Sequence, residues 1–184
     1  FNDVTAQLSD ASGDSDQIAV NVTNDGASAS DSTATIGGTN GIDVGDVEDV
    51  TVTFQDFGTV DTGLALNPGD TASVTLAGGA DVDLTSNGFG GDSNIETIDA
   101  SSLAGDLTIG DLDGNVSSDS DFTFSGAGGV DTVTVDQIDD GNPGSDDEDI
   151  THTYNLASGA DALTIDAQVS DNGDTGDSET LEVS

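Results

Sequence analysis

The sequence of 184 residues contains no Lys, no Arg and no Cys, and it has two Pro and no Trp. Without Cys, the chain can form neither a disulfide nor a thiolate metal or redox site. Without Lys or Arg, it offers no cation to phosphate groups, which excludes nucleic acid as a partner. The 38 acidic residues give a formal net charge of −38. Such a charge opposes compaction, so we expect counterions to neutralise it.

The acidic residues are almost all of one type. Five are Glu, and the remaining 33 (38 − 5) are Asp. Asp favours turns, and its carboxylate is a common ligand of calcium, the natural cross-linker for a secreted chain without disulfides. No apolar run approaches the roughly 18 residues of a membrane span, and the start at Phe1 is typical of a processed form or an excised piece. We therefore expect an extracellular, calcium-binding protein.

Apolar residues recur at every second position in short runs, which is the pattern of half-buried strands. The runs are Ile18–Val22, Val50–Phe54, Val74–Leu76, Leu107–Ile109, Phe122–Phe124, Val133–Val135, Leu163–Ile165 and Leu181–Val183. No segment shows a helical period, and 25 Gly residues disfavour helices. The sequence predicts an all-β fold, a parallel β-solenoid of the β-roll or β-helix kind with calcium in its turns.

An alternative fold is an immunoglobulin-like β-sandwich, alone or combined with a solenoid. The segment Leu64–Leu76 has apolar runs on both sides of Pro68-Gly69. In a sandwich this dipeptide would form the turn of a hairpin.

Three segments share one frame, in which a strand enters a turn of small residues, reaches Gly-x-Asp and continues as a strand. They are Val74–Asp81, Phe122–Asp131 and His152–Asp161. Gly permits a tight turn, and Asp would direct a carboxylate at a cation between successive turns of a solenoid. Asp81, Asp131 and Asp161 are therefore candidate calcium ligands. In the first copy, Asp83 occupies the position that is apolar in the other two copies, and it is a further candidate ligand.

A second repeat has a much longer period. Ala6–Asp10 returns as Ala167–Asp171, and Gly13–Val20 returns as Gly176–Val183. We interpret residues 1–161 as one unit and 162–184 as the start of the next, equivalent to residues 1–22. The chain would then belong to a tandem array, or copies would stack end to end into a filament or sheet.

The segments Asn94–Ile109, Gly45–Val52 and Gly129–Val135 resemble repeats of bacterial surface-layer proteins and of large adhesins of the RTX type. The resemblance implies a right-handed parallel β-roll, calcium in the turns, secretion by a dedicated exporter and self-assembly at the cell surface. Consecutive perfect Gly-Gly-x-Gly-x-Asp nonapeptides are absent, so the resemblance does not extend to a regular ladder of ions.

Other turns also carry oxygen ligands. Asp111, Asp113 and Asn115 place side-chain oxygens at alternate positions beside a Gly, as short calcium loops do, although a simple acidic turn fits as well. Two further clusters concentrate carboxylates whose repulsion a cation would relieve. Their candidate ligands are Asp10, Asp14 and Asp16 in one, and Asp171, Asp174 and Asp177 in the other. The acidic run Asp139–Asp149 is typical of a solvated loop.

Catalysis is disfavoured. His152 is the single His and is expected on a strand surface, and the sequence has no nucleophile elbow of the Gly-x-Ser-x-Gly type. One Tyr and no Trp make a sugar-binding cleft improbable. We expect a structural subunit or repeat of a calcium-stabilised extracellular assembly, a surface layer, matrix filament or adhesin stalk. The alternatives are a ligand-binding adhesin module and a salt-adapted protein of a halophile.

Overall fold

A computed structural model describes residues 4–7, 16–23, 33–36, 41–45, 47–55, 58–66, 71–85, 89–90, 94–110, 112, 116, 120–139, 150–170 and 179–184. These residues form strands and no helix, and the pairs between named strands are all parallel. Across this described part, nothing helical is long and apolar enough to cross a membrane. The fold is a parallel β-solenoid, which confirms the prediction from the alternating apolar pattern.

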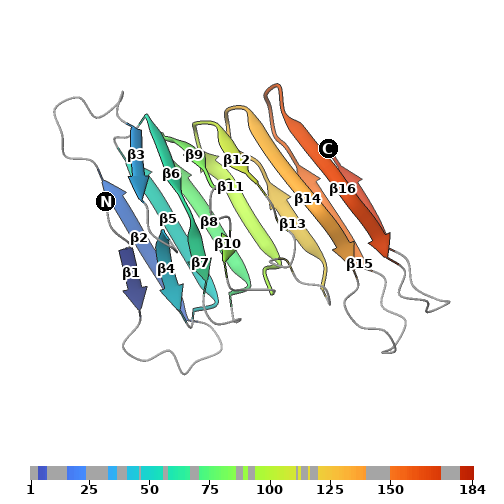
Figure 1. Ribbon diagram of the computed structural model, residues 1–184, viewed down its shortest axis with the longest axis horizontal. Helices are drawn as coiled ribbons and strands as arrows, with labels where there is room; N and C mark the ends of the chain where they lie inside the picture. The colour runs from blue at the N-terminus through green and yellow to red at the C-terminus, as the bar shows by residue number, and fades with distance from the viewer. Residues whose placement is uncertain are drawn as a thin grey trace.

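The chain winds through four turns of three strands each and then continues with two strands per turn (Figure 1). The first turn contains β1 (Val4–Gln7), β2 (Gln17–Thr23) and β3 (Thr33–Ile36). The second contains β4 (Ile42–Gly45), β5 (Asp49–Gln55) and β6 (Thr59–Thr62). The third contains β7 (Leu64–Leu66), β8 (Ser73–Gly78) and β9 (Asp81–Asp83), and the fourth β10 (Phe89–Gly90), β11 (Thr97–Leu103) and β12 (Leu107–Ile109). The later strands are β13 (Phe122–Ser125), β14 (Asp131–Asp139), β15 (Ile150–Asn155), β16 (Ala162–Ser170) and β17 (Glu179–Val183).

Equivalent strands of successive turns form three sheets. The seven-stranded sheet has the order β17-β15-β13-β11-β8-β5-β2, and the six-stranded sheet has the order β16-β14-β12-β9-β6-β3. The four-stranded sheet, β1-β4-β7-β10, covers only the first turns. Each strand therefore has its neighbours in the preceding and following turns, as the repeating pattern of a solenoid requires.

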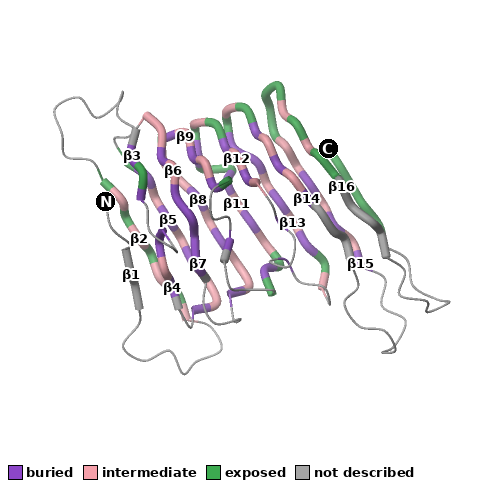
Figure 2. The backbone as a smooth tube through the Cα atoms, viewed as in Figure 1, coloured by how far each residue is buried: buried purple, intermediate pink, exposed green. Residues whose placement is uncertain are grey.

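The core lies between the sheets, and buried residues alternate with less buried ones along strands such as β5, β6, β13 and β15 (Figure 2). One inward column crosses the seven-stranded sheet at a single height. It contains Val50, Val74, Ile98, Phe124 and Tyr154. The aromatic members of this column belong to turns beyond the four-stranded sheet, where larger side chains fill the core.

All eight apolar runs that the sequence marked as strands are strands in the structure. The hairpin around Pro68-Gly69 that the alternative sandwich fold required is wrong, because β7 and β8 belong to different sheets and pair with strands of neighbouring turns. Pro68 and Gly69 themselves lie outside the described residues. The hairpin was inferred from local turn chemistry, which does not reveal the pairing partner of a strand.

The long repeat maps onto the two ends of the solenoid. β17, which repeats the sequence of β2, lies at the opposite edge of the same seven-stranded sheet. β16 and β17 extend the two larger sheets, with one register shift in the β14–β16 pair between Val135 and Gln137. The division into 1–161 and 162–184 stays a prediction.

Candidate metal site at the aspartate corner

Four Asp residues follow one another along the edge where the seven-stranded sheet turns into the six-stranded sheet. Asp81 begins β9, Asp106 precedes β12, Asp131 begins β14 and Asp161 precedes β16. Each follows a short turn from the corresponding strand of the seven-stranded sheet. We call these four residues the aspartate corner. The structure thus brings together three predicted ligands and one residue, Asp106, that was not predicted.

The carboxylates of this corner join one turn of the solenoid to the next. Asp81 Oδ1 accepts the backbone N–H of Asp106 at 2.9 Å, and Asp106 Oδ1 accepts that of Val130 at 2.8 Å. Asp161 Oδ1 accepts the backbone N–H of Asp131 at 3.0 Å. These charge-assisted hydrogen bonds satisfy backbone donors at the corner, so one role of the Asp residues is structural.

The register shows that the four Asp residues occupy two different positions. Leu107 pairs with both Val82 and Asp131, which places Asp131 in a column of inward-facing residues. Asp161 is level with Asp131, because the next residues, Thr132 and Ala162, are partners. Asp81 and Asp106 come one residue earlier and face outward. The shared Gly-x-Asp frame therefore does not give equivalent positions, since turn length decides which residue enters the core.

At Asp131 the usual order of polar and apolar residues is reversed. Val130 is 40% exposed, whereas Asp131, its neighbour in sequence, is 0% exposed. A shift by one residue would bury the Val and expose the Asp. Burial of a carboxylate without full hydrogen bonding costs several kcal/mol, so a structural role alone does not explain this arrangement.

The two oxygens of Asp131 differ. Oδ2 accepts the backbone N–H of Ala127 at 2.9 Å, whereas Oδ1 is buried and has no hydrogen-bond partner among the described residues. Burial, followed by the nearby charges of Asp161 and Asp106, raises the pKa of Asp131 from 3.8 to about 6, against the lowering effects of the backbone N–H groups of Ala127 and, more weakly, Leu107. The site thus favours a positive partner for Asp131, either a proton or a metal ion.

Glycine at this corner permits close stacking of the turns. A Cβ atom at Gly129 would collide with Asp106 Oδ1 and would approach the backbone oxygen of Gly105 to 2.7 Å. The small residues before Asp131 are therefore needed for the contact between successive turns. This contact also brings the carboxylate of Asp106 toward that of Asp131.

The other predicted ligands are not part of this corner. Asp83 Oδ1 accepts the backbone N–H of Thr85 at 2.9 Å and its hydroxyl at 2.6 Å, which makes a local turn. Asp16 precedes β2 and donates its backbone N–H to Glu48 Oε2 at 2.7 Å. The remaining predicted ligands lie outside the described residues: Asp10, Asp14, Asp111, Asp113, Asn115, Asp171, Asp174 and Asp177. Within the described ranges, no three His, Cys, Asp or Glu residues form a group that could hold a metal by themselves.

The Gly-x-Asp frame does not include Asp106, because that frame has one residue between Gly and Asp. In Gly105-Asp106 the two are adjacent, and the strand that follows begins at Leu107. A broader sequence pattern, in which small residues are followed by Asp and then by a strand, includes Asp106. The position of Asp at the start of a strand identifies the residues of this corner better than the number of residues between Gly and Asp.

The prediction that His152 lies on a strand surface is wrong. It is 2% exposed, and its ring centroid is 5.7 Å from that of Phe122. Ile150 and Tyr154, two residues before and after it, are buried as well, so the period of two places His152 inside. Neither ring nitrogen has a hydrogen-bond partner among the described residues, and burial lowers the pKa of His152, which favours the neutral ring.

Replacing His152 with Leu should stabilise the protein at pH 7 by roughly 1–2 kcal/mol, because two buried, unpaired nitrogens are removed. Leu181 already occupies this column in the next turn. Because folding lowers the pKa of His152, its protonation destabilises the wild type as pH falls below 6.5. Urea unfolding at pH 7.5 and 5 should show a larger difference between His152→Leu and wild type at pH 5. An equal difference at both pH values would contradict the effect of protonation.

The chain matches no family model, no curated protein and no solved structure. Evidence on function therefore comes from the aspartate corner and from the surfaces of the solenoid.

Proposed function

We propose that this chain is a calcium-stabilised structural module of an extracellular assembly, such as a surface layer, a matrix filament or an adhesin stalk. The observation that carries the proposal is the burial of Asp131, whose Oδ1 has no hydrogen-bond partner among the described residues. An acidic side chain in the core column, with the apolar Val130 outside, is unfavourable for folding. A cation bound at this oxygen would reverse that penalty.

Calcium suits the chemistry of the corner. It takes six to eight oxygen ligands with flexible geometry, and it accepts both carboxylates and backbone carbonyls. Asp131 would supply a carboxylate, Asp161 of the next turn a second one, and carbonyl oxygens of the Gly-rich turns and water would supply the remaining ligands. The absence of Lys and Arg leaves no side chain of opposite permanent charge to take this role.

The same chemistry would couple folding to the environment. A ligand that binds the folded state alone stabilises it by mass action, so external calcium favours the folded solenoid. In calcium-poor cytosol, repulsion among 38 acidic groups would favour a looser chain that can be exported. A parallel solenoid also suits a structural role, because its repeated turns extend along one axis (Figure 1).

Calcium should raise the temperature of thermal unfolding, and excess chelator should lower it, because the ion binds the folded corner. The measurement is circular dichroism at pH 7 in low sodium, with calcium, magnesium or chelator. Asp131→Asn should lose most of the calcium response. As a matched control, Asp121→Asn should keep it, since the exposed Asp121 also accepts a backbone N–H from the next turn, that of Thr151 at 2.8 Å.

An identical unfolding temperature in calcium and in chelator would overturn the proposal. If molar sodium chloride stabilised the chain while calcium did not, salt adaptation would be the better account. A calcium response that survives unchanged in Asp131→Asn would move the site away from the aspartate corner.

A further inference from the structure

The seven-stranded sheet ends in β17, and the apolar side of this strand is not covered. Leu181 and Val183 are the partners of His152 and Tyr154, which are buried, so they continue two inward columns of the core. In β17, however, Leu181 is 40% exposed and Val183 is 54% exposed. With Ile165 of β16, they are three of the four large apolar side chains that are exposed in the described part of the chain. The core is thus open at this end of the solenoid.

The free edge of β17 also presents backbone groups to a further strand. Ser184 donates its N–H to Tyr154 and accepts the N–H of Leu156, so both of its backbone groups face β15. In a parallel sheet, successive residues direct these groups to opposite sides of the strand. The N–H and C=O groups of Val183, and by the same alternation those of Leu181, therefore point away from β15. An edge with such groups is a template for pairing with another chain.

β17 repeats the sequence of β2, the strand at the opposite edge of the same sheet. Position by position, Leu181 corresponds to Ile18 and Val183 corresponds to Val20. In β2 these apolar residues pack against the core and pair with β5. β17 thus carries the side chains with which β2 covers β5, in the same order and at the same spacing. The edge that fits β17 is therefore the edge of β5.

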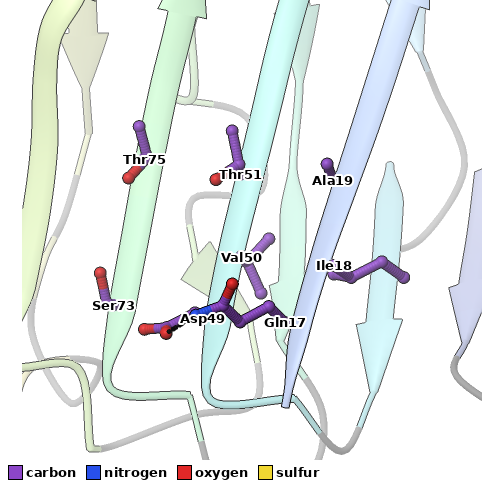
Figure 3. A pocket seen from close by; sticks show the side chains of 8 residues that line it. All are labelled: Gln17, Ile18, Ala19, Asp49, Val50, Thr51, Ser73 and Thr75. Carbon is purple, nitrogen blue, oxygen red and sulfur yellow. Dashed lines mark hydrogen bonds between the residues drawn. The ribbon is translucent and has the colours of Figure 1, made fainter. Parts of the chain in front are cut away.

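The contact between β2 and β5 shows what β17 would meet at that edge. Val50 and Val52 of β5 pair with the apolar residues of β2 and are 1% and 0% exposed. On the outer side, the side-chain amide of Gln17 donates a hydrogen bond to Asp49 Oδ2 at 3.0 Å (Figure 3). β17 has Thr180 at the position of Gln17, and a hydroxyl group is also a donor to a carboxylate. Both the apolar and the polar part of the contact therefore have counterparts in β17.

The two larger sheets end at different heights, which decides how a second copy would be placed. The chain order is β15, β16, β17, so the seven-stranded sheet extends one strand beyond the six-stranded sheet at this end. A copy stacked with its β2 on β17 would leave the width of one strand between its β3 and β16. If β17 instead replaces β2 of the second copy, β3 of that copy lies directly against β16. Ile165 would then be covered by the apolar residues of β3, Ala34 and Ile36, which point inward.

We infer that β17 pairs with β5 of a second copy of this chain, in the place of that copy's β2, so that copies join by strand exchange into a filament. The inference rests on the proposed function, a structural module of an assembly, and names its partner. A β17–β5 pair offsets the β2–β5 pair that is lost, while the β16–β3 contact and the burial of the open end favour the joined form. The displaced β2 competes from within its own chain, so joining requires a high protein concentration. Two copies of charge −38 repel each other, so it also requires calcium or salt.

The test is disulfide trapping, because the 184-residue chain has no Cys of its own. Val183 would lie beside Val52 of the second copy, and paired strands bring Cα atoms to about 5 Å, within reach of a disulfide. Within one copy the two residues cannot meet, since four strands, β15, β13, β11 and β8, separate β17 from β5. The variant Val52→Cys/Val183→Cys, oxidised by air in calcium, should give a ladder of linked chains beyond the dimer. Each single variant can give dimers at most.

The matched pair for stacking without exchange is Val20→Cys/Val183→Cys. A ladder from this pair that equals or exceeds the ladder from Val52→Cys/Val183→Cys would overturn strand exchange. Sedimentation of chains without Cys measures the same contact: Val183→Asn should lower the oligomeric fraction at least fivefold relative to wild type. Val130→Asn is its control and should change little, because Val130 is also an exposed Val but lies between β13 and β14.

Monomers from both Cys pairs, in protein that circular dichroism shows to be folded, would overturn the inference and assign the open end to a further segment of chain or to another partner. Trapping is repeated in molar sodium chloride with chelator, where screening replaces calcium. A ladder there, without any calcium response of unfolding, would overturn the proposed cation site and leave strand exchange standing. A calcium response without a ladder would leave the cation site standing and overturn the exchange.

Discussion

Asp131→Asn should stabilise the ion-free protein at pH 7 by roughly 1–3 kcal/mol. Folding raises the pKa of Asp131 from 3.8 to about 6, and each unit corresponds to about 1.36 kcal/mol. The side chain is fully buried, so solvent does not screen this penalty. Asn has nearly the same shape and can still accept the N–H of Ala127, but it has no charge. Urea unfolding in excess chelator measures the difference.

The sign of the pH dependence follows from the raised pKa. The folded state binds the proton more tightly than the unfolded state, so the penalty is absent below pH 3.8 and complete above about pH 6. Between these values, wild type should lose stability relative to Asp131→Asn as pH rises. In saturating calcium the order should reverse, because the variant has lost a ligand.

Asp121→Asn serves as the control for general charge removal, because Asp121 is exposed. It should shift stability by less than about 0.5 kcal/mol, as most surface substitutions do. A stabilisation of Asp121→Asn equal to that of Asp131→Asn would show that reduced overall charge, and not the burial of one carboxylate, explains the gain. A destabilised Asp131→Asn in chelator would contradict the predicted penalty directly.

Gly78→Ala should destabilise the protein by at least 3 kcal/mol. Gly78 ends β8 with a φ of 120°, a conformation that residues with a Cβ rarely adopt and that costs about 1–3 kcal/mol by itself. A Cβ there would also collide with the backbone oxygen of Phe54 in the preceding turn. This neighbour is a backbone group in a paired strand, so it cannot move without disturbing β5. The cost of the unfavourable φ and the cost of the collision with the Phe54 oxygen add.

Gly79 provides a matched control, because it is the next residue in the same turn. A Cβ at Gly79 would have no heavy atom within 4 Å, and its φ lies outside the left-handed region. Gly79→Ala should change stability by less than about 0.5 kcal/mol, or increase it slightly by restricting the unfolded chain. Comparable losses from both substitutions, measured by urea unfolding, would show that the close approach of β5 and β8 is not as described.

Much of the fold could be predicted because alternation of apolar residues is a local signal. Runs such as Ile18–Val22 and Val50–Phe54 mark strands in the sequence and are β2 and β5 in the structure. The same alternation, applied to Ile150, His152 and Tyr154, would have placed His152 inside. Residue type alone favours the surface for a His, whereas the buried neighbours at every second position place His152 inside.

The candidate site was less predictable. The sequence indicated Asp81, Asp131 and Asp161 as equivalent, yet pairing with the neighbouring turns puts Asp81 outside and Asp131 inside. Turn length sets this difference, and no local pattern reports it. That β2 and its repeat β17 are the two edges of one sheet likewise depends on the winding of all the turns between them.

By itself, the sequence determined the strands, the all-β class and the need for a counterion, because alternation, Gly content and charge act locally or through composition. Only the tertiary structure decided which Asp enters the core and which apolar side chains align from turn to turn. Those outcomes depend on the register between successive turns, where a shift of one residue exchanges the inside and the outside of a strand. The register buries the carboxylate of Asp131, so the need of this acidic chain for a counterion is greatest at that residue.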